Sequence, residues 1–190
     1  MALILASGSP RRLQLMADAG YEFTVEPADI DETPLPNEPA ASYVARLAND
    51  KARHVAERHP EAVVIGADTI VALDGELLGK PADAHDAGAM LGRLSGRAHE
   101  VLTGVAVARD GDVYGIVEVS RVWFRTLGRP EIDAYVATGE PLDKAGSYAI
   151  QGLGGAFVER TEGAWDNIVG LPMAVVARLL AERGGLNGRS

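Results

Sequence analysis

The sequence has no cysteine among its 190 residues, which excludes a disulfide framework, a thiolate zinc site and a cysteine nucleophile. Any metal must therefore be bound by oxygens or by the four histidines. Long apolar runs are also missing, since no segment approaches the roughly 18 uninterrupted apolar residues of a membrane helix. The short apolar run 2–6 precedes its two arginines, whereas a secretory signal begins with its basic residues. We expect a cytoplasmic protein with no membrane segment.

Positive charge is scarce as well. The chain carries 18 Lys and Arg against 27 Asp and Glu, a formal net charge of -9. A protein with this balance is repelled by the phosphates of a long duplex unless its basic residues gather on one face. We therefore expect no duplex nucleic acid as a partner. Small anionic ligands remain open, because a local pocket can be positive on a negative protein.

The hydrophobic spacing predicts strands and helices that alternate along the chain. Strands are predicted at 3–6, 21–25, 62–73, 100–108 and 113–126, and helices at 10–19, 43–55, 83–94, 131–138 and 172–183. Asp110-Gly111-Asp112 predicts a hairpin between the last two strands. Crossovers combined with a long hairpin favour an α/β fold with a mixed sheet. We expect one domain over 1–183 and a loose tail over 184–190.

The segment Ser7-Gly8-Ser9-Pro10-Arg11-Arg12 lies where the first predicted strand turns into a helix. The unpaired amides of a helix N-terminus, two hydroxyls and two guanidiniums are donors suited to a phosphate. The Gly-Lys-Ser/Thr ending of a P-loop is missing. The alternative is a capped helix with two solvated arginines.

Asp68 interrupts the otherwise apolar strand 62–73, and Glu32 lies in the acidic loop 29–34. An ionised carboxylate among strand residues must be paired, bound to a metal or placed at a strand end. Carboxylate oxygens are what Mg²⁺ or Mn²⁺ prefers when it neutralises phosphates, and Asp68 could alternatively be a general base. The alternatives are a strand-end Asp that caps a turn and a solvated acidic loop.

Three lysines and a glycine-rich stretch are further candidates. Lys51 lies beside the apolar stripe of its helix, Lys80 lies between Gly79 and a proline, and Lys144 follows an aspartate with which it could form an ion pair. Gln151, before Gly152, presents both a donor and an acceptor, as reading a pyrimidine edge requires. The alternatives are solvated lysines and tight turns beside an edge strand. No histidine has metal-ligand spacing.

Together these motifs resemble the Maf family of nucleoside triphosphate pyrophosphatases, over nearly the whole chain and in order. They are residues 7–12, 31–32, 46–51, 66–69, 79–81, 95–96, 103–104, 139–146, 150–152 and 169–172. The resemblance implies an inosine triphosphatase-like fold, an elongated mixed sheet flanked by helices, with two lobes around a cleft. It also implies cleavage of a nucleoside triphosphate between its α and β phosphates, with Mg²⁺ or Mn²⁺ as cofactor.

The resemblance also implies a role for individual residues. Asp68 would be the catalytic carboxylate, and with Glu32 it would bind the metal. The phosphate-binding residues would be Ser7, Arg12, Lys51 and Lys80. Arg11, Thr69 and Gln151 are similar to the branch of the family that takes dTTP and UTP, and would set substrate specificity.

Two other functions stay open from sequence. One is a nucleotidyltransferase, which grips a triphosphate with a similar turn but needs an acceptor. The other is a nucleotide-sensing regulator of division with incidental hydrolysis, because the family has been linked to cell-division arrest and to removal of non-standard nucleotides. The sequence gives no oligomeric state, although the apolar strand 113–126 could pair across a homodimer.

Overall fold

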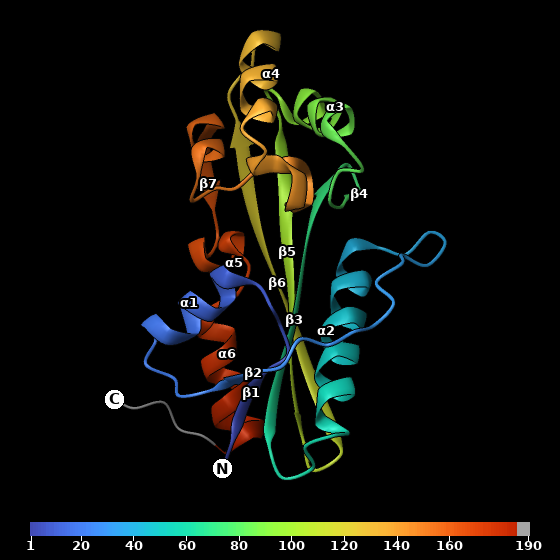
Figure 1. Ribbon diagram of the computed structural model, residues 1–190, viewed down its shortest axis with the longest axis vertical. Helices are drawn as coiled ribbons and strands as arrows, with labels where there is room; N and C mark the ends of the chain where they lie inside the picture. The colour runs from blue at the N-terminus through green and yellow to red at the C-terminus, as the bar shows by residue number, and fades with distance from the viewer. Residues whose placement is uncertain (186–190) are drawn as a thin grey trace. The chain divides into compact units, whose positions relative to one another are not determined.

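The computed structural model describes residues 1–185 (Figure 1). The chain divides into two compact units. Among the described residues, unit 1 comprises 1–69, 103–118 and 170–185, and unit 2 comprises 70–102 and 119–169. Three strands contribute residues to both units: β3 (Val63–Leu73), β5 (Ala98–Arg109) and β6 (Asp112–Phe124). The units are therefore not consecutive halves of the chain.

Unit 1 contains a sheet with helices on both of its faces. Strand β1 (Leu3–Leu5) pairs in parallel with β2 (Thr24–Val25) and with β3, and the strand order continues to β5 and β6. Helix α2 (Ala40–Ala56) covers one face, and α1 (Pro10–Asp18) and α6 (Met173–Leu179) cover the other (Figure 1). Alternate strand residues point to opposite faces, so each face has its own apolar cluster.

Each cluster of unit 1 follows this alternation. Leu3, Val63 and Ile65 pack with Met16 of α1 and Val176 of α6 on one face. On the other face, residues of β1, β3 and β5 pack against residues of α2. The strand residues are Ile4, Val64, Ala106 and Ala108, and the helix residues are Ala48, Ala52 and Val55. The near-continuous apolar runs of β3 and β5 thus reflect strands that are covered on both sides.

Unit 2 combines the remaining parts of β3, β5 and β6 with two short strands and several short helices. Strand β4 (Glu76–Leu78) is antiparallel to β3, and β7 (Val158–Glu162) is antiparallel to β6. The helical elements are α3 (Ala84–Leu94), α4 (Arg129–Ala137), α5 (Trp165–Val169) and the 3-10 turns η1 (Glu140–Asp143), η2 (Ala145–Ser147) and η3 (Leu153–Phe157). Its interior holds edge-to-face aromatic contacts among His99, Phe124, Tyr135, Tyr148 and Phe157.

The fold confirms the predicted mixed α/β sheet and most of the predicted elements. Asp110 and Gly111 both have positive φ, 52° and 87°, as expected of the two-residue hairpin turn that joins β5 and β6. The strand predicted at 21–25 is shorter, because Tyr21 and Phe23 pack against the apolar cluster of α1 and α6 instead of pairing. The helix predicted at 172–183 is α6 followed by the π-helical turn η4 (Leu180–Gly184).

The ends and edges of the chain leave two predictions open. Gly184 ends η4, and residues 186–190 of the predicted tail lie outside the described residues. Strand β6 pairs with β7 through residues 121–124, and a homodimer formed by its remaining edge stays a prediction. Within residues 1–185, none of the helices combines the length and apolar character that a membrane span requires.

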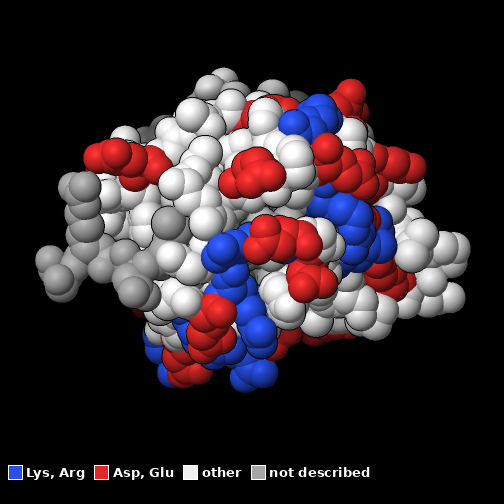
Figure 2. Space-filling model, turned by 90° about the horizontal axis from the view of Figure 1, so that it is seen from below, with Lys and Arg blue, Asp and Glu red and all other residues white. Residues whose placement is uncertain are grey.

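Charges of both signs mix on the surface. Figure 2 shows basic and acidic side chains next to one another on the face seen from below. Some neighbouring charges form ion pairs. Two examples in unit 1 are Arg58 with Glu26, at 2.6 Å, and Arg53 with Asp50, at 3.2 Å. The basic side chains drawn in Figure 2 therefore do not form a surface free of acidic neighbours.

Candidate active site

Two glycines bring α2 into direct contact with the sheet of unit 1. A Cβ atom at Gly66 of β3 would lie 2.2 Å from the carbonyl oxygen of Ala48, and one at Gly104 of β5 would lie 2.2 Å from that of Val44. No larger residue fits at either position without moving the helix backbone. The helix therefore lies close enough to β3 for its side chains to reach the strand's polar position.

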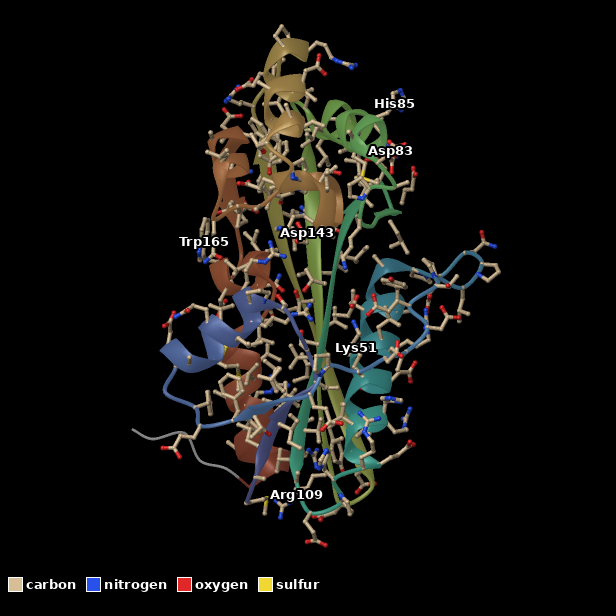
Figure 3. The ribbon with its side chains drawn as sticks, in the orientation of Figure 1. Lys51, Asp83, His85, Arg109, Asp143 and Trp165 are labelled. Atoms are coloured by element: carbon tan, nitrogen blue, oxygen red, sulfur yellow. The ribbon has the colours of Figure 1, made fainter. Side chains whose placement is uncertain are left out.

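Lys51 and Asp68 form a buried ion pair at this contact. The Lys51 side chain extends from α2 towards β3 (Figure 3), and its Nζ lies 2.7 Å from Asp68 Oδ1. The same Nζ lies 2.6 Å from Oε1 of Glu32, which is largely exposed. Lys51 and Asp68 are 7% and 8% exposed. One ammonium thus bridges two carboxylates, one buried and one facing solvent.

Burial raises the pKa of Asp68 above its ordinary value, while the charge and hydrogen bond of Lys51 and the charge of Arg12 oppose that rise. Burial also raises the pKa of the neighbouring Tyr43 to about 12, with a further contribution from the charges of Asp68 and Glu32. A carboxylate with a raised pKa accepts a proton more readily than a solvated one. This environment suits Asp68 to accept a proton, the property that the predicted general-base alternative requires.

Two side chains of α2 that are not among the predicted site residues tie the acidic loop between β2 and α2 to that helix. Tyr43 Oη donates to the Glu32 carbonyl at 3.0 Å, and Arg46 Nη2 donates to that of Thr33 at 3.2 Å. Arg46 also binds both carboxylate oxygens of Glu38 at 2.7 Å, which lowers the pKa of Glu38 to about 2. These contacts set where the loop presents Glu32.

Arg12 lies inside a network that joins the β1–α1 turn to β3. Its Nη1 donates to Ser7 Oγ at 3.2 Å and to the Ala67 carbonyl at 2.8 Å. Its Nε donates to the Gly170 carbonyl at 2.9 Å, and its Nη2 to Thr69 Oγ1 at 3.0 Å. Burial lowers the pKa of Arg12, and Asp68 opposes that shift. Four of its five N–H donors are therefore used within unit 1.

The turn itself begins α1 as the sequence predicts. Ser9 occupies the N-cap and Pro10 the first helical position. The Ser9 side chain makes no capping hydrogen bond; instead the Ser9 amide donates to Ser7 Oγ at 3.3 Å. Ser7 is buried, and Arg11 is half-buried on the first helical turn. The exposed Gly8 leaves the turn open to solvent.

Thr69 shares this network with Thr103, whose role the sequence did not reveal. The two Oγ1 atoms lie 2.9 Å apart, and Thr69 Oγ1 also lies 3.3 Å from the Gly170 carbonyl. Thr103 is fully buried in β5. A hydroxyl within the apolar run 101–108 is the signal that marks it, since a buried polar group needs a partner.

Unit 1 therefore holds seven of the predicted site residues, and unit 2 holds the other two. Those of unit 1 are Ser7, Arg11, Arg12, Glu32, Lys51, Asp68 and Thr69. Lys80 is exposed between β4 and α3, and Gln151 is exposed in the turn before η3. Lys144 forms an ion pair with Asp143, which is the structural role that the sequence offers for it.

The oxygen donors around Lys51 suit a hard divalent cation. Within residues 1–185, no group of three or more His, Cys, Asp or Glu side chains could hold a metal by itself. The carboxylates of Asp68 and Glu32 nevertheless converge on one cationic atom, Lys51 Nζ. Mg²⁺ is commonly bound by one or two carboxylates, waters and substrate phosphates. This donor set fits such a shared site.

Comparisons with known proteins agree over nearly the full length. The family model described as Maf-like protein matches residues 2–183. A dTTP/UTP pyrophosphatase of Myxococcus xanthus is 56% identical over 184 residues, covering 97% of this chain and 93% of the relative. Proteins of the same description from Geobacter metallireducens and Vibrio cholerae are 52% and 51% identical, covering 97% and 94% of this chain and 97% and 96% of theirs.

Solved structures give a weaker likeness. A HAM1 protein from Coxiella burnetii has a TM-score of 0.47 at 19% identity, covering 80% of this chain and 89% of that one. A nucleoside-triphosphatase described as a dITP/XTP pyrophosphatase, from Mycobacterium abscessus, has a TM-score of 0.45 at 16% identity, covering 67% and 76%.

Proposed function

The chain belongs to the Maf family, and from that premise we propose that it hydrolyses dTTP and UTP to the nucleoside monophosphate and pyrophosphate. Relatives named dTTP/UTP pyrophosphatase at 51–56% identity over nearly the whole chain support this reaction. The observation that carries the proposal is the Lys51–Asp68 pair, a buried carboxylate with a raised pKa. The Lys51–Asp68 pair and the Ser7–Arg12 turn both belong to unit 1. Arg12 connects them, because its guanidinium donates a hydrogen bond to the carbonyl of Ala67, the residue before Asp68.

In the proposed reaction Asp68 takes a proton from water, and the water oxygen forms a bond to the α-phosphorus. The bond from the α-phosphorus to the bridging oxygen breaks, and pyrophosphate leaves with that oxygen. Lys51 opposes the rise that burial gives the pKa of Asp68, because its ammonium favours the ionised carboxylate. The ionised form of Asp68 is the one that accepts the proton from water.

Phosphate binding in this proposal draws on the N-terminus of α1. Ser7 and the first amides of the helix offer donors to phosphate oxygens, and Arg12 contributes the one N–H that its contacts in unit 1 leave over. Lys51 and Lys80 supply further positive charge against a triphosphate. Mg²⁺ or Mn²⁺, held by Asp68 and Glu32 together with the substrate, would supply the remaining charge neutralisation.

Substrate choice in this proposal rests on Arg11, Thr69 and Gln151. Uracil and thymine present an N–H donor next to a carbonyl acceptor, and the Gln151 amide offers the complementary pair. Cytosine presents the opposite polarity at these atoms, so a fixed amide discriminates against it. Clearance of modified pyrimidine nucleotides and a link to division arrest would both be consistent with this selectivity.

The other functions receive less support. The relatives reported above are named as pyrophosphatases, which does not favour a nucleotidyltransferase. A sensing role would require binding of dTTP with negligible turnover. A cytoplasmic location and a homodimer remain parts of the proposal that rest on sequence.

The test is the release of pyrophosphate, counted separately from orthophosphate, by the purified chain with Mg²⁺ or Mn²⁺. The panel is dTTP, UTP, CTP, ATP, GTP and 7-methyl-GTP. We expect pyrophosphate from dTTP and UTP with water as the only acceptor. Cleavage restricted to CTP or 7-methyl-GTP would overturn the substrate assignment, and binding without any cleavage would favour the sensor.

A further inference from the structure

Glu140, on η1 of unit 2, binds the backbone of the turn that carries Gln151. Its Oε2 accepts a hydrogen bond from the Leu153 amide at 3.1 Å, and its Oε1 accepts one from the Gly154 amide at 3.1 Å. Tyr135 Oη donates to the same Oε1 at 2.8 Å and accepts from the Ala149 amide at 3.2 Å. The two side chains therefore hold the turn 149–154 on both sides of Gln151. We call this arrangement the Tyr135–Glu140 clamp.

The glycines of the turn make room for the clamp. A Cβ atom at Gly152 would lie 2.5 Å from Glu140 Oε1, and one at Gly154 would lie 2.7 Å from Tyr135 Oη. Neither glycine has a positive φ that would itself demand glycine. Their smallness therefore serves the approach of Glu140 and Tyr135 to the backbone.

The clamp is anchored in the interior of unit 2. Tyr135 is 5% exposed, and its ring packs edge-on against Phe157 with ring centroids 4.9 Å apart. Partial burial favours the neutral acid at Glu140, but hydrogen bonds from Tyr135 and from the Leu153 and Gly154 amides outweigh it and lower its pKa. A charged acceptor binds amides more strongly than a neutral one. The turn is thus fixed by a rigid ring and a carboxylate.

Gln151 itself stays available to a ligand. It is exposed, while Ala149 and Ile150 before it and Gly154 after it are buried. A side chain that reads a base by a donor and an acceptor must be held to within about 0.5 Å and about 10–20° of its productive geometry. The clamp supplies this restraint through the backbone, without itself being placed at the base.

We propose that Tyr135 and Glu140 are positioning residues that set the place of Gln151 and thereby the selectivity for dTTP and UTP over CTP. This inference rests on the proposed function, since it concerns the base-reading residue of the same reaction. Neither residue needs to touch the substrate, so their loss should change which base is accepted more than how fast the phosphate bond is cleaved.

The test compares Glu140→Ala, Glu140→Gln and Tyr135→Phe with wild type, using kcat and KM for dTTP and for CTP. We expect Glu140→Ala to lower the dTTP-to-CTP ratio of kcat/KM about tenfold, mainly through a higher KM for dTTP. Glu140→Gln keeps an acceptor oxygen and should restore part of the ratio. Asp133→Ala, which removes an exposed ion pair with Arg129 on the same helix, is the matched control and should leave the ratio unchanged.

A second measurement separates positioning from loss of the fold. Hydrogen exchange at the Leu153 and Gly154 amides should speed up in Glu140→Ala, with exchange in β5 unchanged. The positioning role alone would be overturned if the wild-type protein prefers dTTP and both Glu140→Ala and Tyr135→Phe keep the wild-type dTTP-to-CTP ratio of kcat/KM. Wild type that cleaves neither dTTP nor UTP would remove the proposed function, and this inference with it.

Discussion

Arg12 shows how a residue predicted to bind phosphate can also organise a site. Its guanidinium reaches four acceptors on three segments: the β1–α1 turn, β3 and the chain at Gly170. The Ala67 carbonyl that it binds belongs to the residue before Asp68. Arg12 thus connects the β1–α1 turn to β3 within unit 1.

We predict that Arg12→Lys destabilises unit 1 by about 2–4 kcal/mol, although it keeps the charge. A lysine has a single nitrogen and cannot serve acceptors in the planar fork that Arg12 spans. Urea unfolding followed by circular dichroism measures the change. Arg53→Lys alters an exposed ion pair on α2 and should stay within about 0.5 kcal/mol of wild type. Equal stability of the two variants would contradict the structural role of Arg12.

Some individual residues of the site could be predicted from the sequence, and others could not. Asp68 stood out because a carboxylate in an apolar strand needs a partner, and the structure supplies Lys51. The pairing of Thr69 with Thr103 could not be predicted, because it joins residues 34 apart in sequence. Glu140 has the same difficulty, since its partners come from two segments and include backbone amides.

Among the helices and strands, long periodic segments were predictable and most short ones were not. Strands β3, β5 and β6 have 11, 12 and 13 residues and were predicted from their apolar runs and the hairpin turn. Strand β4, with 3 residues, and β7 and α5, with 5 each, are too short for a period to emerge. They are set by pairing and packing with neighbours, which a local pattern does not contain.

Gly66 tests the contact between α2 and β3. We predict that Gly66→Ala costs about 3 kcal/mol or more and reduces dTTP hydrolysis, because the new Cβ would meet the α2 backbone 2.2 Å away and push Lys51 from Asp68. Denaturant unfolding and kcat are the readouts. Gly92→Ala on α3 has open space around it and should be neutral or stabilising by up to about 1 kcal/mol. A Gly66→Ala protein with normal stability and rate would refute the close contact.

At the scale of the whole molecule, the predicted site residues are distributed over both units, and each unit organises its own share. Unit 1 contains Asp68, Glu32 and the turn that is predicted to bind phosphate, and unit 2 contains Lys80 and Gln151. Both tryptophans, Trp123 and Trp165, belong to unit 2, so their fluorescence reports on the unfolding of that part of the chain.

His99, a residue of unit 2, should make the stability of the protein depend on pH. Burial lowers its pKa from 6.5 to about 4, and its Nδ1 has no hydrogen-bond partner among the described residues. Between these two pH values the unfolded chain binds a proton that the folded chain does not. The free energy of unfolding should therefore fall by about 3 kcal/mol as the pH drops from 6.5 to 4. Below pH 4 the contribution of His99 should no longer change.

Urea unfolding by tryptophan fluorescence across this range measures the effect. His99→Gln should flatten the dependence, whereas His85→Gln, which alters an exposed histidine at the start of α3 (Figure 3), should retain it. An unchanged slope in His99→Gln would assign the pH dependence to other groups.

Water activation by Asp68 is the step on which the proposed reaction most depends. The direct measurement is kcat for pyrophosphate release from dTTP by Asp68→Asn, beside Asp50→Asn, which changes an exposed carboxylate on α2. We predict that Asp68→Asn loses about 10²–10⁴-fold in kcat while retaining the wild-type circular dichroism spectrum, and that Asp50→Asn keeps the wild-type rate. Near-normal turnover by a folded Asp68→Asn protein would contradict the assignment.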